Sequence, residues 1–335
     1  MSLKKIASMT DTSISTVSRV LNNTSPTSAS KKLQDKIWAA AREIGYQPNE
    51  AARALKKSNK TASAVPHISI VLARISSLDE DTFFSELFRN LEVELMKQKT
   101  VIDHIIYADE SFSQDLSQSL GVIILGRCSH RLLDHITSKN RNVVGIWRNP
   151  MNFNVDEVVC DGKKAAELAM KHLLSLGHRR IAYIGDCSFE SRYVGYCDML
   201  IRNDIPIDYE LIKQTNQTKA EAGSAFLNLL DDKSAGNTDF TAVFCANDNT
   251  AIGVLEVLKE KKRQIKQKIS VISIDNIEDS QFTQPFLTTI NIPRNEMAHM
   301  AVKLLLDRIS KEHEEVVRIE FPCRIIQRDS CYPIN

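Results

Sequence analysis

The sequence predicts an α/β protein with three parts: an N-terminal three-helix head that contains a helix-turn-helix, a short basic connecting segment that can be helical, and a body of two doubly wound parallel-sheet lobes. Short helical patterns with excess basic charge fill the first 60 residues. Apolar strands then alternate with helices of about 10–15 residues, which is typical of βαβ units and parallel sheets. The 335 residues also exceed what one apolar core usually holds.

The head begins with two short helices. Apolar spacing in residues 3–9 predicts a first helix that ends near Thr10, and Asp11 with Thr12 forms a tight connection. Ser13 is suited to cap the second helix, because its hydroxyl can accept a first-turn N–H. An apolar stripe follows at Ile14, Val17, Val20 and Leu21. Two helices joined by three or four residues have the spacing of a helix-turn-helix.

The opposite face of the second helix carries short polar side chains, one long cation and no acid: Ser15, Thr16, Ser18, Arg19 and Asn22. Hydroxyls reach DNA phosphates and base edges, and arginine can donate twice to guanine. The pattern favours a helix that lies in a DNA major groove. On this pattern alone, an ordinary helical hairpin with a solvated polar face is an equal alternative.

Charge divides the chain unevenly. Residues 1–60 carry 11 Lys and Arg against 4 Asp and Glu, a net charge of +7, and the remainder carries −6. A basic head on an acidic body indicates a polyanion-binding module fused to another domain. A third helix is predicted between Ser30 and Gly45. Residues 50–57 are Ala-rich and basic, and residues 58–66 have the polar composition of a linker.

From His67 onward, strand and helix patterns alternate. Strands are predicted at Ile68–Ala73, Val101–Tyr107, Gly121–Leu125, Val143–Trp147, Ile181–Ile184, Ala242–Cys245, Ile269–Ile274 and Val316–Phe321. Helices are predicted at Phe84–Met96, Ala165–Leu176, Tyr193–Ile201, Ala220–Leu230, Thr250–Lys259 and Met297–Ile309. Doubly wound sheets bind ligands at the carboxyl ends of their strands, so polar residues there are site candidates.

Composition and motifs disfavour several classes of function. No apolar run approaches the roughly 20 residues that span a bilayer, and the first ten residues lack a signal-peptide core. The seven cysteines show no CxxC pairing, which fits free thiols in a reducing cytoplasm. Metal-ligand spacing, phosphate-binding loops and GxSxG are not found. We expect a cytoplasmic protein that is not an enzyme and uses no metal or cofactor.

Eight motifs occur in order along nearly the whole chain. They are T-V-S-R-V-L-N at Thr16–Asn22, G-Y-Q-P-N at Gly45–Asn49, A-A-R-A-L at Ala51–Leu55, G-H-R-R-I-A-Y-I-G at Gly177–Gly185, R-Y-V-G-Y at Arg192–Tyr196, A-V-F-C-A-N-D at Ala242–Asp248, I-S-V-I-S-I-D-N at Ile269–Asn276 and P-F-L-T-T-I at Pro285–Ile290. In this order and spacing they resemble the LacI/GalR family of transcriptional repressors.

The resemblance implies a DNA-binding head at residues 1–48, a hinge helix and linker at 49–66, and a periplasmic-binding-protein-like core at 67–335. The core would bind a small effector, usually a sugar, and would form a homodimer. Its first lobe would comprise about 67–158 and 288–321. Its second lobe would comprise about 159–287 and 322–333.

The resemblance also implies DNA contacts. Ile14, Ser15 and Arg19 would face base edges in the major groove. Contacts to phosphates, or support of the helix, are implied for Thr16, Ser18 and Asn22.

The hinge motif carries a second set of implied contacts. Asn49 and Arg53 would act at the DNA backbone and minor groove, and Leu55 would be an apolar wedge. A leucine inserted between base pairs kinks the duplex, and the bend lets both heads of a dimer reach their half-sites. The competing interpretation is that Leu55 is a linker residue.

Departures from the family pattern point to one branch. Asp11 stands where a turn glycine is common, but aspartate tolerates the left-handed conformation. The loop Asn23–Ala29 is about two residues longer than in most members. This loop, Ser117–Gly126 and Phe282–Ile290 resemble the galactoside-utilisation branch, which includes evolved-β-galactosidase repressors.

Sugar binding requires planar polar groups and an apolar wall. Polar candidates at strand ends are Arg127, Arg148, Arg192, Asn247 and Asp275. Phe84, Trp147 and Phe282 are candidates for the wall, although each is equally suited to the apolar core. Because Asn247 and Asp248 precede a predicted helix, either can cap it. We expect Asn247 to contact the ligand and Asp248 to cap.

The sequence therefore predicts a homodimeric repressor of a carbohydrate-utilisation operon that binds double-stranded operator DNA. A small sugar between the lobes, with galactosides as first candidates, would release it. Two alternatives stay open. One is a family member controlled by a corepressor or a partner phosphoprotein. The other is a sugar-binding protein without a regulatory role.

Overall fold

The computed structural model describes residues 3–21, 29–44, 46, 66–78, 81–108, 115–188, 190–231, 240–262, 265 and 267–334. By its internal contacts the chain divides into two units, Met1–Ala64 and Val65–Asn335. We call the first unit the head and the second the body, and each is described by itself.

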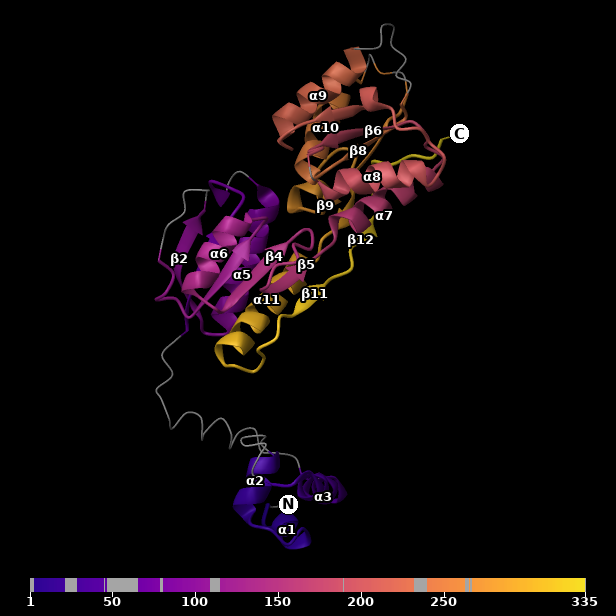
Figure 1. Ribbon diagram of the computed structural model, residues 1–335. Helices are drawn as coiled ribbons and strands as arrows, with labels where there is room; N and C mark the ends of the chain where they lie inside the picture. Colours follow the sequence, from indigo (N-terminus) through magenta and orange to yellow (C-terminus); the bar gives the residue numbers. More distant parts are fainter. Residues whose placement is uncertain are drawn as a thin grey trace. The chain divides into compact units, whose positions relative to one another are not determined.

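The described part of the head forms three helices, α1 (Leu3–Met9), α2 (Ile14–Leu21) and α3 (Lys31–Glu43), drawn in indigo in Figure 1. One residue from each helix, Ile6, Val17 and Ile37, is fully buried in a shared apolar cluster. Asp11 has the left-handed backbone conformation, φ 50°, that the turn requires. Ser13 Oγ accepts the N–H of Thr16 at 3.1 Å, as expected of an N-cap. The predicted helix-turn-helix is therefore confirmed.

The first lobe of the body is built on a parallel sheet of order β11-β5-β4-β3-β1-β2 (Figure 1). Its strands are β1 (His67–Leu72), β2 (Val101–Tyr107), β3 (Gly121–Leu125), β4 (Val143–Trp147), β5 (Asp156–Val159) and β11 (Arg318–Glu320). Its helices are α5 (Thr82–Lys97), α6 (His130–Lys139) and α11 (Arg294–Ile309). The inner strands β3 and β4 are wholly buried, as expected where helices cover both faces of a parallel sheet.

The second lobe has a sheet of order β12-β10-β9-β8-β6-β7, in which only the β10–β12 pair is antiparallel. Its strands are β6 (Ile181–Gly185), β7 (Ile212–Gln214), β8 (Ala242–Cys245), β9 (Ser270–Asp275), β10 (Thr288–Asn291) and β12 (Arg324–Ile326). Its helices are α7 (Gly162–Ser175), α8 (Ser191–Ile201), α9 (Lys219–Asp231) and α10 (Asp248–Glu260), with short 3-10 turns η3 (Tyr209–Leu211) and η4 (Glu278–Gln281).

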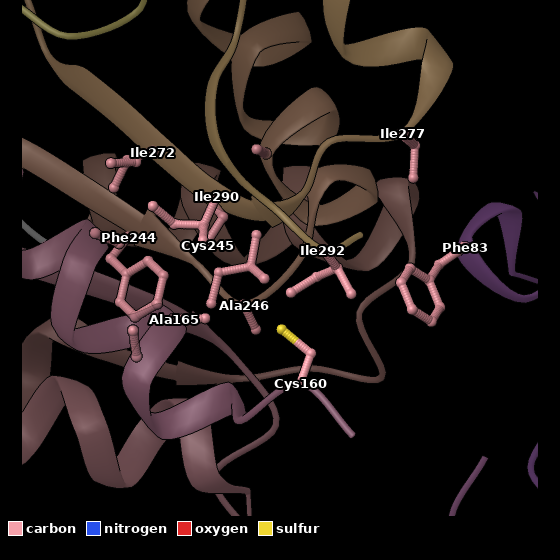
Figure 2. Close-up of a cluster of buried hydrophobic side chains, with 14 of the residues drawn as sticks. Phe83, Cys160, Ala165, Phe244, Cys245, Ala246, Ile272, Ile277, Ile290 and Ile292 are labelled. Atoms are coloured by element: carbon pink, nitrogen blue, oxygen red, sulfur yellow. The ribbon is translucent and has the colours of Figure 1, made fainter. Parts of the chain in front are cut away.

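The chain passes between the lobes after β5, after β10 and after β11. A single apolar cluster runs through both lobes and these crossovers. Figure 2 shows part of it, with Cys160, which follows β5, and Ile292, which follows β10, among side chains from β8, β9 and β10. The strand ends of both lobes are thereby held around the same region of the body.

Two boundary predictions were wrong. Residues 288–291 were assigned to the first lobe, but they form β10 of the second sheet, where Ile290 lies beside Ile274 of β9. The crossover comes only afterwards, and α11 then packs against α5 and the first sheet. The last strand, predicted at Val316–Phe321, is shorter and comprises only Arg318–Glu320. It pairs with β5, which is itself short and so limits the length of the ladder.

Strand β5 was missed because it begins with two acids, Asp156 and Glu157, which are buried. The Asp156 carboxylate accepts from Arg308 Nε at 2.9 Å and from the N–H of Val317 at 2.8 Å. Arg318 Nε donates to Glu157 at 2.9 Å. Buried carboxylates persist where such partners satisfy them, and these partners lie about 150 residues away in the sequence.

Helices α9 and α10 pack closely enough to test by mutation. A Cβ added at Gly253 would lie 2.1 Å from the backbone oxygen of Lys219, whereas one added at Gly223 would be 3.4 Å from its nearest neighbour, Val257 Cγ2. We expect Gly253→Ala to lower the free energy of unfolding by about 1–3 kcal/mol through this clash. Gly223→Ala should be neutral or slightly stabilising because alanine favours helix. Urea unfolding followed by circular dichroism measures both, and equal midpoints would contradict the close contact.

Candidate functional site

A cleft of about 400 Å³ lies at the carboxyl ends of strands from both sheets. The first lobe contributes Arg74, Ile75, Asp81, Phe84, Gly126, Arg127, Trp147, Arg148, Asn149 and Met151. The second lobe contributes Glu190, Asn216, Gln217, Thr218, Asn247 and Asn249. The volume falls within the roughly 300–1,000 Å³ of small-molecule sites, and the location is where doubly wound sheets bind ligands.

Five of the predicted effector residues line this cleft: Phe84, Arg127, Trp147, Arg148 and Asn247. Arg192 and Asp275 lie behind the lining, each bonded to a residue that does line it. Phe282 is different. Its side chain is 71% exposed and borders a separate hollow with Lys219 and Ile252, so the predicted place in the same apolar wall is wrong. Its position after η4 carries it away from the strand ends.

Arg192 is almost completely buried and organises the second-lobe side of the cleft. Its Nε and Nη2 each donate to the Glu190 carboxylate at 2.9 Å, and Nη2 also donates to Gln217 Oε1 at 3.0 Å. Its Nη1 donates to the carbonyl of Ala246 at 2.6 Å. Burial alone would raise the pKa of Glu190, but the charge and hydrogen bonds of Arg192 lower it to about 2. Arg192 therefore holds Glu190 and Gln217, two lining residues, in place.

Asn247, and not Asp248 as expected, caps α10. Asn247 Oδ1 accepts the N–H of Thr250 at 2.9 Å and caps α10, although the residue also lines the cleft. The Asp248 carboxylate instead accepts from Ser273 Oγ at 2.6 Å, Thr289 Oγ1 at 2.6 Å and the N–H of Ile277 at 2.8 Å. It joins β9, β10 and the loop after β9. Complete burial raises its pKa to about 6 despite these hydrogen bonds.

Asp275 ends β9 with an unusual backbone. Its φ is 125° and that of Asn276 is 53°, conformations that cost energy outside glycine. Arg294 donates to the backbone carbonyls of both residues, which stabilises this turn. The Asp275 carboxylate accepts from Arg148 Nη2 at 3.0 Å across the lobes. Burial raises its pKa to about 7, against the opposing charges of Arg148 and Arg192.

Arg148 is held over an aromatic face. Its guanidinium carbon lies 4.1 Å from the centre of the Phe83 ring. Within the described residues, five buried side-chain polar atoms have no hydrogen-bond partner, and four of them lie at or beside the cleft: Trp147 Nε1, Arg148 Nε, Asn249 Oδ1 and Asp275 Oδ1. Unpaired buried polar atoms cost about 1–3 kcal/mol each, so this clustering suits a site that binds a polar ligand.

Several lining residues were missed from sequence, among them Arg74, Asp81, Asn149, Glu190 and Gln217. Arg74 and Asn149 follow β1 and β4, so the strand-end rule could have found them. Gln217 follows β7, a three-residue strand that the sequence did not predict. Glu190 caps α8 and is recognisable only once Arg192 is seen to turn back to it.

Helix α2 of the head presents the polar face predicted for DNA. Ile14, Ser15 and Arg19 are exposed, and Thr16 and Ser18 are half-buried. Val17 on the opposite face is fully buried. Four further predicted DNA contacts, Asn22, Asn49, Arg53 and Leu55, lie outside the described residues. No helix in the described parts of the chain has the length and apolar composition to cross a membrane.

Comparison with known proteins assigns the family. A model of the bacterial regulatory proteins of the lacI family matches residues 2–49, and one of periplasmic binding protein-like domains matches residues 170–331. The transcriptional repressor CytR of Escherichia coli K12 is 30% identical over 98% of this chain and 95% of its own length. The chain belongs to the LacI family of bacterial regulatory proteins. As a member of that family it is a DNA-binding transcriptional repressor.

Other members of the family resemble it in sequence or in fold. The repressor MelR of Bacillus subtilis is 28% identical to this LacI-family repressor, over 98% of this chain and 97% of MelR. A LacI-family regulator from Enterococcus faecium with bound ribose is 28% identical, with a TM-score of 0.69 over 80% of this chain and all of that one. The lac repressor dimer bound to operator and the anti-inducer ONPF has the same fold, with 21% identity and a TM-score of 0.66 over 99% of each chain.

Proposed function

We propose that this repressor binds a pseudo-palindromic operator as a homodimer in the cytoplasm and that a small sugar in the cleft releases it. It would control a carbohydrate-utilisation operon, with galactosides as the first effector candidates. The observation that carries the proposal is that both lobes line one cleft. A ligand held by both lobes favours the arrangement in which it makes the most contacts, and so shifts the population of body conformations.

The chemistry of the lining suits a sugar. Asn149, Gln217 and Asn249 offer amides that can both donate and accept, as hydroxyl groups require. Trp147 and Phe84 supply apolar surface for a ring face. Solved relatives of this fold contain ribose and cellobiose. These features support a carbohydrate effector over a purely apolar one.

The proposed route from cleft to DNA passes through the hinge. The effector-bound arrangement would disfavour pairing of the two hinge segments, so that Leu55 leaves the minor groove and Asn49 and Arg53 lose their contacts. Effector and operator would then weaken each other's binding by the same factor, because the coupling is reciprocal.

Operator release tests the proposal. An operator is selected from a random DNA pool, and fluorescence anisotropy then measures its affinity for the full chain with and without galactose, lactose, ribose and cellobiose. We expect at least one sugar to weaken binding by about 5–150-fold, the usual range of such coupling. Tighter binding with ligand would select the corepressor alternative, and no effect of any of these sugars would contradict release by a neutral sugar.

The base-reading role of helix α2 gives a separate prediction. Arg19→Ala should weaken binding to the selected operator by about 10–100-fold, corresponding to about 1–3 kcal/mol, because bidentate base contacts are lost. Lys36→Ala removes the same charge from an exposed position on α3 and is the matched control. Lys36→Ala should weaken operator and scrambled DNA alike and only slightly. Equal losses for both variants on both DNAs would refute a base-reading role for Arg19.

A further inference from the structure

We propose that the effector is an anionic sugar, carrying a phosphate or carboxylate group that the first-lobe arginines Arg74 and Arg127 bind. This inference rests on the proposed sugar-responsive function and specifies the chemical class of the ligand. Of the described arginines around the cleft, two have a carboxylate partner and two do not.

Among the described residues, two carboxylates line the cleft and a third pairs with an arginine that lines it, and each has a partner within the protein. Asp81 Oδ1 accepts the N–H of Phe83 at 2.9 Å and caps α5. Glu190 forms its two hydrogen bonds with Arg192. Asp275 is paired with Arg148 at 3.0 Å. The protein therefore supplies acids for Arg148 and Arg192.

Arg74 and Arg127 have no acidic partner of this kind among the described residues. Both line the cleft, and neither makes a hydrogen bond or ion pair with another residue in the described part of the chain. They flank the same point, because a Cβ placed on Gly126, the residue before Arg127, would lie 3.2 Å from Arg74 Cβ. Two guanidiniums without a protein partner in one cleft are suited to one multidentate oxyanion.

The surroundings of Arg74 oppose its charge. Although part of its side chain is exposed, desolvation lowers the pKa of Arg74, and the positive charges of Arg148 and Arg192 lower it further, while Glu190 and Asp81 act in the opposite direction. An anion bound at this point would relieve that repulsion. A neutral sugar would accept hydrogen bonds from arginine but would leave the cluster of positive charge uncompensated.

Backbone dipoles add to the positive potential. Helices α5, α8 and α10 are capped by Asp81, Glu190 and Asn247, and all three caps line the cleft, as does Thr218 directly before α9. The amino ends of these helices carry partial positive charge. Of these four helices, α5 and α8 have acidic caps, whereas α9 and α10 carry their acids, Glu221 and Asp248, within the first turn.

The unpaired buried atoms suggest an orientation for the ligand. On the first lobe they are donors, Trp147 Nε1 and Arg148 Nε, and Trp147 is only 2% exposed. On the second-lobe side of the lining, the unpaired atom is an acceptor, Asn249 Oδ1. Donors suit oxyanion atoms and acceptors suit hydroxyls. The charged group is thus placed toward the first lobe and the sugar hydroxyls toward the second.

The test compares one ring with three substituents. Thermal shift and operator anisotropy are measured for the full chain with galactose, galactose 6-phosphate and galacturonate, and with glucose, glucose 6-phosphate and glucuronate. Inorganic phosphate is the control for an adventitious ion. We expect a charged sugar to bind roughly tenfold or more tightly than its neutral counterpart. The phosphate and carboxylate arms show which anion is preferred.

Matched variants locate the charge recognition. Arg74→Gln and Arg127→Gln should each weaken binding of the charged sugar by roughly tenfold or more, and should weaken binding of the matching neutral sugar much less, because a neutral sugar loses only a hydrogen bond. Arg141→Gln removes an exposed first-lobe arginine that does not line the cleft, and it should change neither.

The two readouts separate the two proposals. Release by neutral sugars as strong as by charged ones overturns the anionic effector and keeps the sugar-responsive repressor. Tight binding of a charged sugar without any effect on the operator supports anion recognition and overturns release by sugar. Binding of inorganic phosphate as tight as that of the phosphosugar, or no binding of any charged sugar, overturns the inference.

Discussion

Arg192→Met is expected to lower the free energy of unfolding of the body by about 3–5 kcal/mol, because it leaves a buried carboxylate without its partner. Arg192 and Glu190 are nearly fully buried and joined by two hydrogen bonds of 2.9 Å. The variant should also lose its effector response, since Glu190 and Gln217 line the cleft and are both held by Arg192. Urea unfolding and effector titration measure the two losses.

The pH dependence identifies the cause of this loss. In the wild-type protein the pKa of Glu190 is lowered from 4.5 to about 2, so its contribution is present above pH 4.5 and is lost as the pH falls toward 2. Without the Arg192 guanidinium, the main opposition to burial is lost, and the pKa of Glu190 rises. The deficit of the variant should therefore be largest at neutral pH and shrink toward pH 5.

A double variant provides the control. Glu190→Gln in the Arg192→Met background removes the unpaired charge and should regain a large part of the lost stability. If the double variant unfolds as easily as Arg192→Met, or if the deficit does not change with pH, the uncompensated Glu190 charge is not the cause.

The order of elements was largely predictable from the sequence, because helices such as α7 and strands such as β8 carry strong apolar periodicity and clear end signals. Asp11 in the left-handed conformation and Ser13 as a cap followed from local chemistry alone. Strand β5 could not be predicted in this way, because its two acidic first residues have low strand propensity. They are accommodated only in the folded protein, where Arg308 and Arg318, distant in sequence, bind them.

The site was predictable as a set of strand ends but not as a set of contacts. Arg127, Arg148 and Asn247 were found because they follow buried strands. Whether Asn247 or Asp248 caps the helix depends on which of the two has the extended backbone that precedes the first helical residue. The sequence does not show at which residue this change occurs. The direction of the Arg192 side chain depends on Glu190 and Gln217, whose positions are set by the tertiary packing.

Asp248→Asn is expected to gain stability relative to the wild-type protein as the pH rises. Burial raises the pKa of Asp248 from 3.8 to about 6, so the folded protein binds this proton more tightly than the unfolded chain. The resulting stability is fully present below pH 3.8 and is lost as the pH rises through about 6. The difference between the two pKa values corresponds to on the order of 3 kcal/mol.

Asparagine reproduces the protonated carboxyl at every pH. Its amide oxygen can accept the N–H of Ile277, and its amide nitrogen can donate to Ser273 Oγ and Thr289 Oγ1, the groups that Asp248 contacts. Subtracting the two unfolding curves removes most of the contribution of Asp275, and what remains has the same sign, because only in the wild type does the charge of Asp248 help to raise the pKa of Asp275. The stability of Asp248→Asn minus that of the wild type should thus rise by on the order of 3 kcal/mol between pH 4 and 8.

The control for this result keeps the carboxylate and removes one donor. Thr289→Val loses a hydrogen bond that lowers the pKa of Asp248, so its pH-dependent loss of stability should persist and move to higher pH. A difference between Asp248→Asn and wild type that stays constant from pH 4 to 8 would show that Asp248 is ionised throughout. The stabilities that Asp248 and Glu190 contribute thus change with pH in opposite directions, because the Glu190 carboxylate is hydrogen-bonded by a cation and that of Asp248 by neutral donors.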